Sequence, residues 1–198
     1  MIDKFYFKIL INNYENSLVC IFNSFFDSIK LDATHIVGGE MTYNYLGNNI
    51  YQINLTIYRD CGSTNTNNTG FDQLGVVRIY NSDNSLYSSI DISNPSVLNL
   101  GSETINCSEF LSALCLETGT YSFEIFLPNS NDGYTVAYQR CCRNPSVINI
   151  ENPEIFGSTF YVNIPGENLN NNSSPNFNSY PPKAVCLGYP ININQSAI

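Results

Sequence analysis

The sequence of 198 residues lacks tryptophan, has a single histidine, and contains only eight basic residues against 17 acidic ones. The resulting formal net charge of -9 argues against nucleic acid or an anionic membrane as a partner, because both require a basic patch. No apolar run approaches the roughly twenty residues of a membrane-spanning helix. Only 13% of the residues are charged, so Asn, Ser and Thr supply most of the polarity.

Catalytic motifs are also lacking. No GxSxG, HExxH or phosphate-binding loop occurs, and a Ser-His-Asp or Cys-His arrangement would have to use His35. No EF-hand loop is present, and Asn-Asp-Gly at 131–133 predicts a turn rather than a calcium site. Five scattered acids could meet after folding, although acids on a β surface are usually solvated: Glu40, Asp60, Asp72, Glu117 and Glu124. We therefore expect no enzyme activity, no cofactor and no bound metal.

Cysteine, in contrast, is abundant. Cys20 lies near the N-terminus, and six more cysteines lie in the body of the chain: Cys61, Cys107, Cys115, Cys141, Cys142 and Cys186. So many cysteines are unusual in a cytosolic protein and favour structural disulfides. Zinc is an alternative, but no CxxC pair occurs and there is only one histidine; buried free thiols are another.

Two bridges are expected, although sequence alone does not choose among the possible connectivities. Cys107 and Cys115 lie eight residues apart in a connection that we expect to be irregular, and a bridge between them would tether that segment. Cys61 and the adjacent Cys141 and Cys142 end two strands that we expect to be neighbours, so Cys61 should join one of that pair. The last body cysteine would then bind the remaining vicinal cysteine or a partner in a further domain.

Residues 133–144 (GYTVAYQRCCRN) form the most strongly patterned stretch. Tyr134, Val136 and Tyr138 fall on one face of a β-strand, and the intervening residues fall on the other. The two cysteines at its end should point to opposite faces, because successive side chains of a strand alternate. We predict that this strand is the central, stapled strand of a β-domain.

Period-two patterns predict further strands, at 36–46, 50–59, 75–80, 85–92, 120–127 and 158–164. The first two form the clearest hairpin across a Gly-Asn-Asn turn at 47–49, and Gly-Gly at 38–39 predicts a bulge. The next two form a second hairpin. Residues 93–118 and 144–156 are predicted to be irregular.

This set of short strands, without a convincing helix, predicts an all-β fold: an immunoglobulin-like antiparallel β-sandwich stapled by disulfides. We place the sandwich at 34–165, after a degenerate signal or leader at 1–33 in which polar residues interrupt the apolar ones. Residues 166–182, rich in Asn, Ser and Pro, predict a linker. Residues 183–198 are expected to begin a further β-domain that this chain does not complete.

Four stretches resemble, in order, the N-terminal module of large secreted proteins of Bacteroidetes-type bacteria: ATHIVGGEMTY at 33–43, YRDCG at 58–62, YQRCCRN at 138–144 and NFNSYPP at 176–182. Proteins of that kind often carry PKD-like or cadherin-like repeats and end in a gliding-motility-associated, type IX secretion sorting domain. The resemblance covers about residues 33–198. It implies export across both membranes, an extracellular or outer-membrane cell-surface location, and further domains in the full-length protein.

With no catalytic motif in view, the resemblance implies a non-catalytic module that contributes to adhesion, surface assembly or a gliding-associated surface structure. Its partners would be other surface proteins. The alternative is a glycan-binding module that recognises extracellular glycans. Pairs such as Tyr43/Tyr45 and Tyr58/Tyr80 would suit stacking on sugars, whereas tyrosine on a sandwich more often packs across strands.

Overall fold

The computed structural model describes residues 36–61, 70–100, 115–141, 143–144, 147–166, 172–179, 185, 188, 190 and 192–198. The predicted leader at 1–33 and His35 lie outside the described residues. So do three of the predicted bridge residues, Cys107, Cys142 and Cys186.

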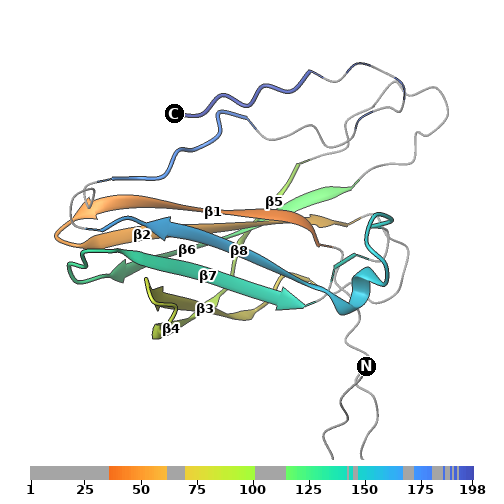
Figure 1. The fold of residues 1–198 in the computed structure, drawn as a ribbon. Helices are drawn as coiled ribbons and strands as arrows, with labels where there is room; N and C mark the ends of the chain where they lie inside the picture. The colour runs from red at the N-terminus through yellow and green to blue at the C-terminus, as the bar shows by residue number, and fades with distance from the viewer. Residues whose placement is uncertain are drawn as a thin grey trace, which may run out of the picture. The chain divides into compact units, whose positions relative to one another are not determined.

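The described chain forms two four-stranded antiparallel sheets that pack as a β-sandwich (Figure 1). Sheet 1 has the order β1-β2-β6-β5 and sheet 2 the order β4-β3-β7-β8. The elements are β1 Ile36–Gly47, β2 Ile50–Asp60, β3 Leu74–Asn81, β4 Leu86–Ser93, β5 Ser96–Asn99, β6 Leu116–Phe126, β7 Tyr134–Cys141, the 3-10 turn η1 Pro153–Ile155, and β8 Gly157–Ile164.

The strand order is that of an immunoglobulin-like domain. If the strands are lettered along the chain as A, B, C, C′, D, E, F and G, sheet 1 reads A-B-E-D and sheet 2 reads C′-C-F-G. The predicted fold class, an all-β immunoglobulin-like sandwich stapled by a disulfide, is confirmed.

The core lies between the sheets and follows the alternation of the strands. In β2, Ile53, Leu55 and Ile57 are no more than 1% exposed, and the residues between them face outward. In β7, Val136 and Tyr138 are no more than 2% exposed, on the face that the sequence pattern predicts. Since burial of a side chain of this size contributes roughly 1.5–3 kcal/mol, the facing rows supply most of the driving force for packing the sheets.

The first hairpin is confirmed, including its bulge. β1 and β2 pair along their whole length, with register shifts between Ile36 and Gly38 and between Tyr45 and Gly47. The first shift changes the face on which the preceding residue lies, so Val37 is 54% exposed although simple alternation would place it on the same face as the buried Met41 and Tyr43. The turn uses a left-handed backbone at Asn48 and its two neighbours.

The connection from β6 to β7 crosses from sheet 1 to sheet 2, and a hydrogen bond from Tyr134 spans it. Its phenol donates a hydrogen bond to the carbonyl oxygen of Pro128 at 3.1 Å, which is the tyrosine corner of immunoglobulin-like sandwiches. Gly133 has a φ of +80°, and a Cβ there would lie 2.1 Å from the carbonyl oxygen of Ile164. Any other residue would therefore both strain the backbone and clash with the end of β8.

The disulfide pairing differs from the prediction. Cys61 is bonded to Cys115, with 4.9 Å between their Cα atoms, so the expected Cys107–Cys115 bridge and the expected link from Cys61 to the vicinal pair are wrong. The reason is sheet membership. β2 pairs with β6, which places the residue after Asp60 opposite the residue before Leu116, whereas Cys141 ends a strand of the other sheet. Cys141 is also disulfide-bonded.

Two boundaries also differ from the prediction. The stretch at 93–118, expected to be irregular, contains β5 and the first residues of β6. All four residues of β5 are exposed, so no alternation marks the strand. β6 begins at Leu116 rather than at 120, because Gly119 and two flanking threonines obscure its apolar pattern.

The chain after β8 returns to the open edge of β1. The backbone N–H of Ser174 donates to the carbonyl oxygen of Tyr43 at 2.9 Å, and the N–H of Tyr43 donates to the Ser174 hydroxyl at 2.8 Å. The N–H of Tyr45 donates to the Ser173 hydroxyl at 3.0 Å. Ser173 and Ser174, in a stretch that the sequence predicts to be linker, are thus hydrogen-bonded to the edge of β1.

The same segment pairs with the last residues of the chain. Phe177 and Ala197 form an antiparallel bridge, and Asn176 exchanges both backbone hydrogen bonds with Ile198. We refer to residues 172–179 and 192–198 together as the C-terminal ribbon.

Candidate functional site

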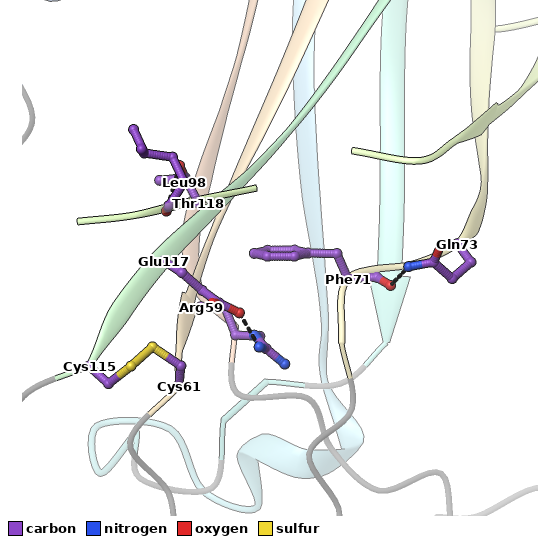
Figure 2. Close-up of polar contacts among 8 residues, drawn as sticks. All are labelled: Arg59, Cys61, Phe71, Gln73, Leu98, Cys115, Glu117 and Thr118. Carbon is purple, nitrogen blue, oxygen red and sulfur yellow. Dashed lines mark hydrogen bonds and ion pairs between the residues drawn. A yellow bond between two sulfur atoms is a disulfide. The ribbon is translucent and has the colours of Figure 1, made fainter. Parts of the chain in front are cut away.

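A buried ion pair lies at the end of the sandwich where the disulfide closes β2 against β6 (Figure 2). Arg59 and Glu117 are partners in the β2–β6 register, two residues before Cys61 and two residues after Cys115. Their side chains are 9% and 14% exposed, and the guanidinium donates to the Glu117 carboxylate. The inner face of sheet 1 therefore carries one matched pair of charges instead of two apolar residues.

The ring of Phe71 also contacts this arginine. The Arg59 guanidinium carbon lies 5.2 Å from the ring centroid, within the range of a cation–π interaction. On the opposite strand a Cβ at Gly119 would lie 2.7 Å from the ring, so only glycine lets the aromatic ring approach the β6 backbone this closely. Gly119 thus makes room for Phe71, which packs at 6% exposure beside the ion pair.

A second polar cluster surrounds Asp72, the residue after Phe71. One carboxylate oxygen accepts a hydrogen bond from the Tyr138 phenol, and the other lies 3.1 Å from Arg140 Nη2. The Tyr121 phenol donates to the backbone carbonyl of Asp72 at 2.6 Å. Tyr121 belongs to sheet 1, and Tyr138 and Arg140 belong to sheet 2, so Asp72 connects the two sheets through the segment that precedes β3.

Both phenols of this cluster resist ionisation. Burial raises the pKa of Tyr121 from 10.0 to about 12, and the nearby Asp72 charge acts in the same direction. Burial also raises the pKa of Tyr138, and its hydrogen bond to Asp72 adds to the effect, since a phenolate could not donate that bond. The pKa values of Tyr43, Tyr51 and Tyr134 are raised as well, again chiefly by burial.

These shifts predict a loss of stability at high pH. A group whose pKa is higher in the folded state stabilises the fold fully below its unfolded pKa, and this contribution disappears as the pH rises through the folded value. For Tyr121 the window runs from about 10 to about 12. We expect the absorbance of phenolate at 295 nm to develop later in the native protein than in urea. A Tyr138→Phe variant should lose part of the absorbance increase that the native protein shows at high pH. Superimposable titration curves for the native and denatured protein would contradict the prediction.

Three of the five acids considered from the sequence have donors in this structure. Glu117 binds Arg59, Asp72 binds Tyr138 and Arg140, and Glu40 accepts a hydrogen bond from the Tyr58 phenol at 2.9 Å. Within the described ranges, no three His, Cys, Asp or Glu side chains gather as a metal site would require. We interpret the charges at the disulfide end as structural, because protein groups already bind them.

A groove lies on the outer face of sheet 1, beneath the C-terminal ribbon. Its two connected parts have volumes of about 380 and 490 Å³, and they share four residues: Glu40, Tyr58, Phe177 and Ser179. The floor comes from the outward-facing residues of β1 and β2, and the walls come from the two halves of the ribbon. The remaining lining residues are Gly38, Gly39, Thr42, Asn54, Thr56, Asn176, Asn178, Ile193, Asn194 and Gln195.

The tyrosine pairs considered for sugar stacking do not form as expected. Tyr43 is only 3% exposed and packs edge-on against Tyr51, and Tyr45 is partly buried against the same ring. Tyr58 and Tyr80 lie on different sheets. Of these four, Tyr58 lines the groove, together with Phe177 from the ribbon, which lies 119 residues further along the chain in a segment without strand periodicity.

Among the described residues, no helix has the length and apolar character needed to cross a membrane. Comparison with protein-family models, curated proteins and solved structures found no match to this chain.

Proposed function

We propose that this chain is a non-catalytic, disulfide-stapled module of an exported protein that acts at the cell surface or outside the cell. The observation that carries the proposal is the Cys61–Cys115 bridge across the ends of two paired core strands. Bridges of this kind form and persist in oxidising compartments, and they are rare where thiols are kept reduced.

The distribution of charge supports a structural role. The buried ionisable groups at the disulfide end are bound to one another, and the tyrosines beside them have pKa values raised away from neutrality. A general base or nucleophile needs a pKa near the working pH and access to a substrate. The resemblance of four sequence stretches to N-terminal modules of large secreted bacterial proteins agrees with a role in adhesion, surface assembly or a gliding-associated surface structure.

Cell fractionation combined with thiol mapping tests this proposal. We expect the protein in the extracellular or outer-membrane fraction, and a non-reduced digest should yield Cys61 and Cys115 in one cross-linked peptide. Alkylation in denaturant should leave both residues unmodified until a reductant is added. Stable protein in the cytoplasm with both thiols free would overturn the proposal.

A further inference from the structure

We infer that the groove between sheet 1 and the C-terminal ribbon binds a neutral saccharide. This inference deepens the proposed function, on which it rests, by naming the class of partner that the module holds. The two parts of the groove, about 380 and 490 Å³, fall in the range of about 300–1,000 Å³ that is usual for small-ligand sites.

The composition of the lining disfavours anionic ligands. None of the described lining residues is basic, so phosphate, sulfate and carboxylate groups would find no counter-charge there. Glu40 is the single acid, and it would repel an anion. The remaining polar groups are amides and hydroxyls, which both donate and accept hydrogen bonds. A neutral polyol has the same dual character at every hydroxyl, and it therefore matches this surface better than an anion does.

The floor of the groove is held ready for such a ligand. The Ser122 hydroxyl donates to Asn54 Oδ1 at 2.8 Å, which fixes the amide and leaves its Nδ2 donors for another partner. The hydroxyls of Thr56 and Thr120 lie 3.2 Å apart across β2 and β6. Because these side chains are oriented by neighbours on the sheet, little side-chain entropy would be lost on binding.

Two aromatic rings complete the site. Tyr58 is fixed at one end by its hydrogen bond to Glu40, and Phe177 is 63% exposed on the ribbon side. The face of an aromatic ring is electronegative, so it attracts the weakly positive C–H groups on the apolar side of a sugar ring. Amides and hydroxyls on the floor with rings at the margin would thus contact both the hydroxyls and the C–H face of a saccharide.

Binding of neutral gluco-, galacto-, manno- and xylo-oligosaccharides to the full chain, purified with its disulfides formed, tests the inference. Saturation-transfer NMR and calorimetry would give the epitope and the Kd. We expect saturable binding of at least one neutral oligosaccharide, with oligogalacturonate and hyaluronan oligomers binding more weakly. Phe177→Ala should weaken that binding at least about tenfold through loss of the ring face, and Asn54→Ala about fivefold through loss of the amide.

Sheet 2 offers a matched control for each variant. Tyr161 is 60% exposed, close to the 63% of Phe177. Asn163 accepts a hydrogen bond from Thr135 at 2.9 Å, as Asn54 does from Ser122. Tyr161→Ala and Asn163→Ala should leave the affinity unchanged.

Three results would overturn the inference: no binding by any neutral oligosaccharide of the panel, equal losses in the sheet 2 controls, or a preference for the acidic oligomers. Each would leave the location and the Cys61–Cys115 bridge as they are. Fractionation and thiol mapping therefore judge the proposed function separately from the groove.

Discussion

Replacing both Cys61 and Cys115 with serine is expected to lower the free energy of unfolding by about 4 kcal/mol and the melting temperature by roughly 10 °C. The bridge joins residues 54 positions apart, so it removes from the unfolded chain the freedom of a long loop. In the chain-entropy description a loop of that length corresponds to a value between about 3 kcal/mol for a short loop and about 5 kcal/mol for a very long one. Urea denaturation of the oxidised proteins measures the difference.

Reductant supplies the control for this double variant. Dithiothreitol should destabilise the wild type more than the variant. Reduction breaks the Cys61–Cys115 bridge in the wild type only, whereas the disulfide of Cys141 is present in both proteins. The backbone hydrogen bond from the Cys61 N–H to the Cys115 carbonyl, at 3.0 Å, should keep the strand ends paired in the variant. An unchanged free energy of unfolding would contradict the prediction. It would indicate that residual pairing of β2 with β6 restricts the unfolded chain even without the bridge.

Arg59→Met is expected to cost about 3 kcal/mol, because it leaves the Glu117 carboxylate at 14% exposure without its counter-charge. The same change also removes the guanidinium from the face of Phe71. Converting both partners, as Arg59→Met with Glu117→Leu, should restore most of the loss, since an apolar pair needs no desolvation of charge. The measurement is a double-mutant cycle from denaturant unfolding curves.

Arg78→Met is the matched control for the arginine, because Arg78 is exposed on the outer face of β3. Its effect should stay within about 0.5 kcal/mol. If Arg59→Met were equally mild, the Arg59–Glu117 contact would contribute little to stability despite its burial. If the double variant were worse than either single one, the charges would instead be needed to set the register of β2 against β6.

Local patterns predicted those parts of the fold in which neighbours in sequence are neighbours in space. The β1–β2 hairpin, the β3–β4 hairpin and the buried face of β7 follow from alternation over a few residues and from turn residues such as Asn48. β5 was missed because all four of its residues face solvent and it is held by pairing with β6 alone. Its existence depends on partner residues 18 to 24 positions further along the chain, which no local pattern encodes.

The bridges and the candidate sites depend on which strands share a sheet. Cys61 meets Cys115 because β2 pairs with β6, and that pairing also joins Arg59 to Glu117. Once the β2–β6 register is known, both contacts follow, and the residue counts from each cysteine to its charge are equal. The sequence signal was therefore present in the symmetric spacing of Arg59-x-Cys61 and Cys115-x-Glu117, but it has meaning only for antiparallel partners.

The groove was beyond prediction for a different reason. The polar face of β1 and β2 is visible in the alternation, for example in Asn54 and Thr56, but its cover comes from residues 172–179 and 192–198. The first segment was predicted to be linker and the second to begin a further β-domain. The first is held at the β1 edge by serine hydroxyls and backbone groups rather than by an apolar stripe, and the second pairs with the first. Composition distinguishes packed from unpacked segments only when packing uses apolar side chains.

The contact of the C-terminal ribbon with β1 has a consequence for self-association. A strand at the margin of a sheet presents backbone donors and acceptors that can template pairing with another molecule. Here the hydrogen bonds from Tyr43 and Tyr45 to Ser173 and Ser174 use those groups within the same chain. If the ribbon detached, the identical segment of a second molecule could take its place, and the product would be a domain-swapped dimer rather than an open aggregate.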